Sequence, residues 1–295
     1  MDISMALGGG GSRGHAHIGV LRWLEQEGFR IRALAGTSAG GIIAVAYAAG
    51  YTPDELETIF SELDQTKLFA RSSHDGPGIL GLSGATRELD KILGERTFAD
   101  LHIPCAVVAV DINSGCEVVL SEGRVVDAIL ATIAVPGVFP PKVYGEMQLV
   151  DGAVLNPVPV SVARSLAPKL PVVAVILDPL VESSVSLSNI PLPVQVPVPL
   201  VERLTRTRVA QAFNIFLQSV DLGSRKLAEM RLRLDDPDVI IRPDVSGIGL
   251  LDNVDVHKVV RLGEKAAAAV LPELNRVVAW PNRVYQAVFP RRVQK

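Results

Sequence analysis

Residues 32–50 read RALAGTSAGGIIAVAYAAG, a short apolar run followed by a serine between two glycines and then by small apolar residues. This pattern predicts a buried strand, a tight turn at Ser38 and a helix. A G-x-S-x-G turn of this kind is typical of an enzyme nucleophile, because Gly36 and Gly40 leave room for a sharp strand-to-helix turn. The alternative is a serine that only caps the helix. The rest of the chain has to decide between the two.

Short apolar runs alternate with helical patterns along most of the chain, which predicts an α/β fold with a largely parallel central sheet flanked by helices. Asn113-Ser114-Gly115 is the expected turn of a hairpin within residues 103–120, and residues 70–84 are expected to form a glycine-rich loop. The other strands are predicted at about residues 2–7, 31–35, 146–150, 171–177 and 238–242. Helices are predicted at about residues 15–27, 39–49, 124–134, 200–230 and 255–271, with a further helix starting at Thr52.

The composition excludes several classes of function. The chain has 295 residues, of which 48% are hydrophobic, so it can bury a sizeable core. Its formal net charge of −3 gives no basic field, and we therefore expect no nucleic-acid partner. The two cysteines, Cys105 and Cys116, are too few for a disulfide framework, and we expect both to be buried and reduced. The sequence does not indicate an oligomeric state.

Targeting signals are not evident in the sequence. The N-terminal stretch MDISMALGGGG has no basic segment followed by a long apolar one, and no segment reaches the ~18 apolar residues of a membrane span. We therefore expect a cytoplasmic protein, with peripheral attachment to a membrane as a further hypothesis.

Residues 7–14, LGGGGSRG, contain Gly9-x-Gly11-x-x-Gly14, which nominally fits a dinucleotide-binding fingerprint. That function also needs an acidic residue at the end of the second strand, where this chain has Leu34-Ala35-Gly36, so nicotinamide binding is not expected. Consecutive glycines at a helix N-terminus can still direct backbone N–H groups at an anion, either a phosphate or an oxyanion. Arg13 either adds a positive charge there or is solvated.

Residues 149–153, LVDGA, place Asp151 before Gly152. Taken alone, this dipeptide favours a hairpin turn. Taken with a glycine loop and a serine turn, it supplies the base that the serine needs. Of the five histidines, only His257 lies late in the chain, and its helical pattern favours a surface or packing role. His15 and His17 are expected to pack near the glycine loop.

The order GGGGSRG, GTSAG and DGA resembles the patatin-like phospholipase family. Three further segments strengthen the resemblance, namely AHIGVL at 16–21, AVPGVFPP at 134–141 and Asn156-Pro157. It extends over residues 4–180 and, more loosely, over 235–270, where the chain resembles compact bacterial members of the family.

The resemblance implies a three-layer α/β/α fold and a lipid acyl hydrolase of the phospholipase, lysophospholipase or esterase type. It implies a Ser-Asp dyad of Ser38 and Asp151 that works through an acyl-enzyme, with no cofactor and no metal. The oxyanion hole would comprise Gly9, Gly10, Gly11 and Arg13, supported by the motif glycines Gly14, Gly36, Gly40 and Gly152. The alternative is a membrane-associated regulatory protein or a phosphate-binding protein with little turnover.

The domain prediction is one patatin-like domain over residues 1–275, with a proline-rich excursion at about 181–200, followed by a basic and aromatic tail over 276–295. The tail interleaves arginines with Trp280, Tyr285 and Phe289, a mixture that suits the surface of an anionic bilayer. The alternative is a terminal segment that packs its aromatic side chains on the body of the protein.

Overall fold

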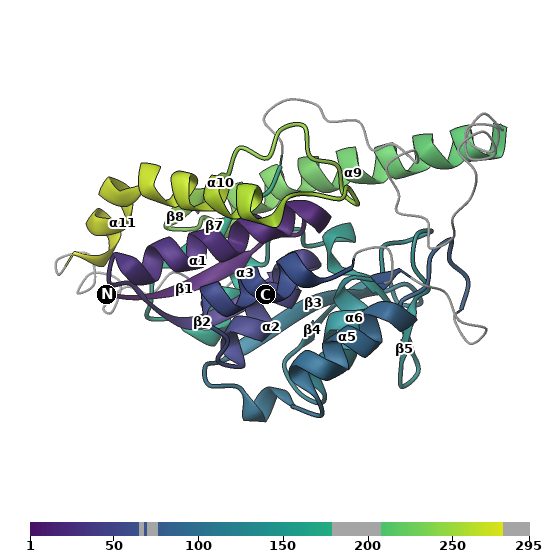
Figure 1. The fold of residues 1–295 in the computed structure, drawn as a ribbon, viewed down its shortest axis with the longest axis horizontal. Helices are drawn as coiled ribbons and strands as arrows, with labels where there is room; N and C mark the ends of the chain where they lie inside the picture. The colour runs from purple at the N-terminus through teal and green to yellow at the C-terminus, as the bar shows by residue number, and fades with distance from the viewer. Residues whose placement is uncertain (65–67, 70–75, 179–207, 280–295) are drawn as a thin grey trace.

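The computed structural model describes residues 1–64, 68–69, 76–178 and 208–279, which form a central sheet of eight strands between two layers of helices (Figure 1). The order of the main strands is β5-β6-β3-β2-β1-β7-β8, and β4 pairs with β3. The strands are β1 (Asp2–Leu7), β2 (Arg30–Thr37), β3 (Cys105–Asp111), β4 (Cys116–Leu120), β5 (Lys142–Tyr144), β6 (Met147–Asp151), β7 (Val172–Val175) and β8 (Val239–Ile241).

The sheet is mixed but mostly parallel. The pairs β1–β2, β1–β7, β2–β3 and β7–β8 are parallel, whereas β3–β4, β3–β6 and β5–β6 are antiparallel. The carboxyl ends of β1, β2 and β7 therefore lie at the same edge of the sheet. In sheets of this type, ligands bind in the crevice outside that edge.

Nine helices are described along the chain, together with three short 3₁₀ segments. The helices are α1 (Ala16–Gln26), α2 (Ala39–Ala48), α3 (Pro53–Glu62), α5 (Ser83–Leu93), α6 (Val125–Thr132), α7 (Val160–Leu166), α9 (Arg208–Asp235), α10 (Val256–Ala269) and α11 (Leu271–Val278). The 3₁₀ segments are η1 (Gly11–His15), η2 (Phe98–Asp100) and η3 (Gly152–Val154). Among the described residues, none of these helices combines the length and the apolar character needed to cross a bilayer.

The two faces of the sheet carry separate hydrophobic cores, because side chains alternate between the faces of a strand. Met5 and Leu7 of β1 enter the larger core, which α1, α2, α6 and α10 cover. Ala6 enters the smaller core on the other face, with α7 and with Ala228 and Leu232 of α9. This arrangement is the three-layer architecture that the sequence predicts.

Most predicted elements are confirmed to within a few residues, including the helix that begins at Thr52 with a capping box. The sequence patterns do not predict β5, α5, α7 or α11. The expectation that Cys116 is buried is wrong, because it begins β4, which lies off the main path of the sheet and is largely open to solvent. The proline-rich excursion and residues 280–295 lie outside the described residues, and α11 contains the first residues of the predicted tail.

Helices α1 and α10 lie side by side on the larger core, and their backbones approach closely (Figure 1). A Cβ atom added to Gly19 of α1 would lie 1.9 Å from the carbonyl oxygen of Val260. One added to Gly263 of α10 would lie 1.9 Å from the carbonyl oxygen of Ala16. Both positions therefore need the absence of a side chain for steric reasons.

We predict that Gly263→Ala separates the two helices and lowers the free energy of unfolding by about 1–3 kcal/mol. The matched control is Gly223→Ala in α9, where an added Cβ would meet no atom within 4 Å. That variant should gain up to about 1 kcal/mol, because alanine loses less backbone entropy than glycine. Urea unfolding of both variants measures the difference, and equal effects would contradict the close packing of α1 on α10.

Candidate active site

The register of the sheet brings Ser38 and Asp151 together. Strands β2 and β6 both pair with β3, and they do so at consecutive residues. Thr37 at the end of β2 pairs with Val108, and Asp151 at the end of β6 pairs with Ala109. Because Ser38 follows Thr37 directly, both predicted catalytic residues emerge at the same place along β3.

Ser38 has a strained backbone, with φ 54° and ψ −126°, in a region that non-glycine residues rarely occupy. The neighbouring glycines make this turn possible because the absence of a side chain leaves room for close backbone contacts, and not because glycine is flexible. A Cβ on Gly36 would lie 2.5 Å from the carbonyl oxygen of Gly40, and one on Gly40 would lie 2.2 Å from the carbonyl oxygen of Leu7. The predicted elbow is therefore present in the structure, and both motif glycines are required by close contacts.

Three hydrogen bonds hold the elbow in place. The amide of Ser38 donates to the hydroxyl oxygen of Thr132 at 2.9 Å, and that hydroxyl donates to the carbonyl of Val108. The hydroxyl of Thr37 donates to the carbonyl of Asn156 at 2.9 Å. No sequence motif marks Thr132, and its role was not predicted, whereas Asn156 lies in a segment that carries the family resemblance.

The carboxylate of Asp151 is buried and accepts two hydrogen bonds. The Ser38 hydroxyl donates one, and the amide of Ala153 donates the other at 2.8 Å. Burial raises the pKa of Asp151 from 3.8 to about 6, and these two hydrogen bonds act in the opposite direction. A carboxylate with a pKa near 6 is ionised at neutral pH, and it is also a stronger proton acceptor than an exposed aspartate.

The glycine loop follows β1 and lies directly above Ser38. A Cβ on Gly9 would lie 3.3 Å from that of Ser38, so this position must remain small. The Gly9 amide already donates to the carbonyl of Pro157 at 3.0 Å. The amides of Gly10 and Gly11 have no acceptor among the described residues, which leaves these two N–H groups available near the serine.

Two further motif glycines allow neighbouring segments to approach the elbow. A Cβ on Gly14 would lie 2.6 Å from the Cβ of Ala39, at the start of α2. A Cβ on Gly152 would lie 2.3 Å from the carbonyl oxygen of Val108. Side chains at either position would displace the loops that carry the oxyanion candidates and Asp151.

Arg13 is a buried cation, with 2% of its surface exposed. Its Nε donates to the carbonyl of Ile248 at 2.7 Å, and its Nη2 has no hydrogen-bond partner among the described residues. Arg13 lines a cavity beside Ser38 and Asp151.

Ser38 lies where two cavities meet. The first, here called the apolar cavity, has a volume of about 180 Å³ and extends over α2, α3 and α5. Its lining is almost entirely hydrophobic and includes Ile42 and Ala46 of α2. The remaining lining residues are Gly11, Ser12, His15, Ser38, Ala39, Leu56, Ile59, Phe60, Leu63, Leu68, Phe69, Ala85, Glu88, Leu89, Ile92, Leu93, Ile133, Val135, Phe139, Leu250 and Leu251.

The second cavity, here called the charged cavity, has a volume of about 80 Å³ and also contains Asp151. Helix α9 forms one wall, and its charged side chains Asp221 and Arg225 face Arg13 and Asp178 across the space. No sequence motif marks Asp178, Asp221 or Arg225 as site residues. No group of three or more metal-ligating side chains occurs among the described residues, in this cavity or elsewhere.

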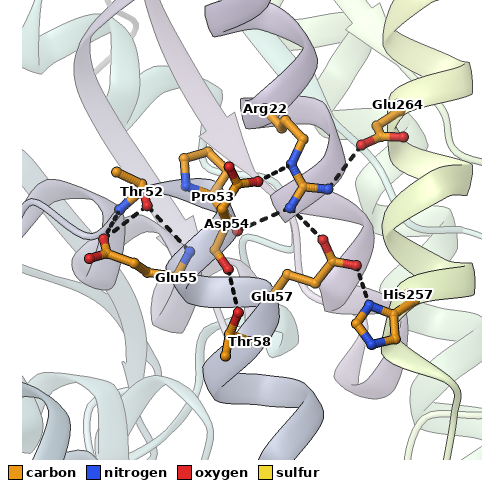
Figure 2. A network of polar contacts seen from close by, with 9 residues as sticks. All are labelled: Arg22, Thr52, Pro53, Asp54, Glu55, Glu57, Thr58, His257 and Glu264. Atoms are coloured by element: carbon orange, nitrogen blue, oxygen red, sulfur yellow. Dashed lines mark hydrogen bonds and ion pairs between the residues drawn. The ribbon is translucent and has the colours of Figure 1, made fainter.

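His257 lines neither cavity and belongs to an ion-pair network between α1, α3 and α10 (Figure 2). Its Nδ1 is 2.5 Å from an oxygen of Glu57, which also contacts Arg22. Arg22 contacts Asp54 at 2.8 Å and Glu264 at 3.0 Å as well. The network therefore ties α3, a wall of the apolar cavity, to the body of the protein. The His257 side chain is exposed, in agreement with the surface or packing role expected for it.

The two early histidines each donate to a backbone carbonyl. His17 Nε2 bonds to Gly8 at 2.8 Å, and His15 Nδ1 bonds to Ser12 at 2.8 Å. Burial lowers the pKa of His17 to about 4, so this side chain is neutral at physiological pH. Both contacts fix the glycine loop and the start of α1.

Known proteins resemble this chain in sequence and in fold. Residues 5–164 match the patatin-like phospholipase family. An uncharacterized NTE family protein of Mycobacterium bovis is 30% identical over 288 residues, which cover 93% of this chain and 48% of that protein. Patatin-like phospholipase domain-containing protein 6 of Mus musculus is 27% identical over 175 residues, covering 57% of this chain and 13% of the mouse protein.

The fold is also found among solved structures. The crystal structure of VipD from Legionella pneumophila aligns with a TM-score of 0.58 and 12% identity, covering 92% of this chain and 66% of VipD. The chain spans about half the length of the mycobacterial relatives that it matches. From the family match and the elements described above, we conclude that the chain belongs to the patatin-like phospholipase family.

Proposed function

We propose that this chain hydrolyses acyl esters of lipids through an acyl-enzyme, with Ser38 as the nucleophile and Asp151 as its base. The observation that carries the proposal is the hydrogen bond from the strained Ser38 to a buried carboxylate, at the junction of an apolar and a charged cavity. Patatin-like phospholipases are in general serine lipid hydrolases, which supports the same chemistry here.

In the first half of the reaction, the Ser38 oxygen attacks the ester carbonyl carbon while its proton passes to Asp151. The amides of Gly10 and Gly11 would donate to the oxyanion, and a donor of this kind typically contributes about 3 kcal/mol to catalysis. The tetrahedral intermediate then expels the alcohol, which takes the proton from Asp151. In the second half, water loses a proton to Asp151 and attacks the acyl-serine. The carboxylic acid then leaves as Asp151 returns this proton to the Ser38 oxygen.

The apolar cavity would hold the acyl chain, because an alkyl chain there makes hydrophobic contacts without leaving polar groups unpaired. The face of α2 that carries Ser38, Ile42 and Ala46 follows this cavity. At a rise of 1.5 Å per residue, Ala46 lies about 12 Å along the helix from Ser38, roughly the length of an extended ten-carbon chain.

We propose that the enzyme meets its substrate by a peripheral contact with a lipid surface. The basic and aromatic composition of residues 276–295 and the lipid substrates of the family support this proposal. Most of these residues lie outside the described part of the chain, so the proposal rests on sequence alone.

The dyad predicts that Ser38→Ala and Asp151→Asn each lower kcat/KM for a soluble short-chain ester by about a thousandfold or more, because the two residues act as a unit. His257→Ala serves as the control, and it should change kcat/KM by less than about threefold, since its partner is Glu57. Circular dichroism checks that each variant is folded. A folded Ser38→Ala variant that retains activity would exclude Ser38, and a wild type without turnover would favour a binding or regulatory protein.

We predict that Ala46→Leu shortens the apolar cavity and shifts the preferred acyl length to shorter chains. For p-nitrophenyl esters, kcat/KM should fall about tenfold for dodecanoate relative to butyrate, because the added side chain occupies the far part of the cavity. Ala268→Leu, on an exposed part of α10, provides the matched control. An unchanged chain-length profile in Ala46→Leu would mean that the acyl chain binds elsewhere.

A further inference from the structure

About half of the residues that line the charged cavity lie outside the segment that matches the family. The match ends at residue 164, whereas Asp178 follows β7 and one wall of the cavity belongs to α9. Leu177 lies close to the glycine loop, because a Cβ on Gly10 would be 2.9 Å from its side chain. This cavity can therefore determine a substrate preference that is particular to this chain.

The chemistry proposed above assigns the leaving alcohol to this cavity. Asp151 takes the proton from Ser38, and the same carboxyl group must return it to the alcohol oxygen as the ester bond breaks. Asp151 lines the charged cavity and not the apolar one. The acyl chain and the alcohol thus occupy different cavities, with Ser38 between them.

Among the described residues that line this cavity, positive and negative side chains balance apart from the catalytic carboxylate. Asp221 and Arg225 of α9 form an ion pair one helical turn apart. Arg13 and Asp178 face this pair. Burial lowers the pKa of Arg13 and raises that of Asp178, and the opposite charges of these two side chains counteract both shifts. Because Asp151 adds a further negative charge when it acts as a base, a net anionic alcohol would meet repulsion there.

The same side chains also disfavour a purely apolar alcohol. Nη2 of Arg13 is buried and has no hydrogen-bond partner in the described part of the chain, so an alkyl group placed against it would leave this donor unpaired. The carboxylates of Asp178 and Asp221, which also line the cavity, need hydrogen-bond donors from the alcohol in the same way. The cavity therefore suits an alcohol with both kinds of hydrogen-bonding group.

We propose that the charged cavity selects esters whose alcohol has no net charge and carries both hydrogen-bond acceptors and donors or a cationic group, and that Asp178 excludes net anionic alcohols. This inference rests on the proposed function. Two sources supply such chemistry, a polyhydroxyl alcohol such as glycerol and a zwitterionic phosphodiester. A phosphate monoester or an anionic phosphodiester carries the excess negative charge that the cavity disfavours.

The test compares soluble hexanoyl esters that share one acyl chain and differ in the alcohol. The alcohols are glycerol, glycerophosphocholine, glycerol 3-phosphate and butanol, and short acyl chains keep the substrates monomeric, so that a charged lipid surface does not influence the result. Release of hexanoic acid gives kcat/KM for each ester. We expect kcat/KM for the ester of glycerol or glycerophosphocholine to exceed kcat/KM for the glycerol 3-phosphate ester by about tenfold or more. Repulsion by one like charge in a partly buried site implies a difference of this size. The butyl ester should also have a lower kcat/KM than the better of the glycerol and glycerophosphocholine esters.

The variant Asp178→Asn removes the negative charge with little change in shape. It should reduce the discrimination against glycerol 3-phosphate by about tenfold, mainly through a lower KM for that ester. The matched control is Asp244→Asn, an exposed aspartate beyond β8 that does not line the cavity. It makes the same change in net charge and should leave the selectivity within about twofold, because solvent screens exposed charges.

Three results would overturn the inference. They are a wild type that prefers the glycerol 3-phosphate ester, a wild type that prefers the butyl ester, and an equal shift in selectivity for Asp178→Asn and Asp244→Asn. The wild-type ranking decides the matter even if Asp178→Asn does not fold. Absence of hydrolysis of every ester, or hydrolysis that persists in Ser38→Ala, would instead contradict the proposed function.

Discussion

The contact between the Ser38 hydroxyl and the buried Asp151 carboxylate is the interaction on which the arrangement of the site depends. It requires a strained turn at the end of β2 and a carboxylate removed from water. Because the pKa of Asp151 in the folded protein is raised from 3.8 to about 6, the ionised form destabilises the fold above that pH, by on the order of 3 kcal/mol. This penalty disappears below pH 3.8, where the group is protonated in both the folded and the unfolded state. A buried carboxylate retained at such a cost is typical of a functional site.

The fold places two different cavities on the two sides of this contact. Strand β3 sets the spacing of Ser38 and Asp151, and the glycine loop after β1 closes over them. On one side, α2, α3 and α5 enclose an apolar cavity, and the network around Arg22 fastens α3 in place (Figure 2). On the other side, α9 supplies charged side chains. An amphiphilic ester would span the two cavities with its carbonyl group at the serine.

The sequence predicts the layers of the fold and the elbow well, because both depend on local patterns of apolar residues and glycine. It suggests Asp151 only through the combination of three motifs, since Asp-Gly alone favours a turn. Thr132, Asp178 and the charged face of α9 could not be predicted, because their roles arise from tertiary contacts between distant segments. The exposure of Cys116 could not be predicted for a similar reason, since the exposure of β4 depends on its place in the sheet.

The most direct test of the account is the rate at which a fluorophosphonate modifies the protein as a function of pH, because the probe reports activation of the serine without requiring the natural substrate. Peptide mapping should find the modification on Ser38. The second-order rate should rise with an apparent pKa of about 6 as Asp151 ionises, and Asp151→Asn should react slowly at every pH. Modification of another serine, or a pH profile that is the same in wild type and Asp151→Asn, would contradict the dyad.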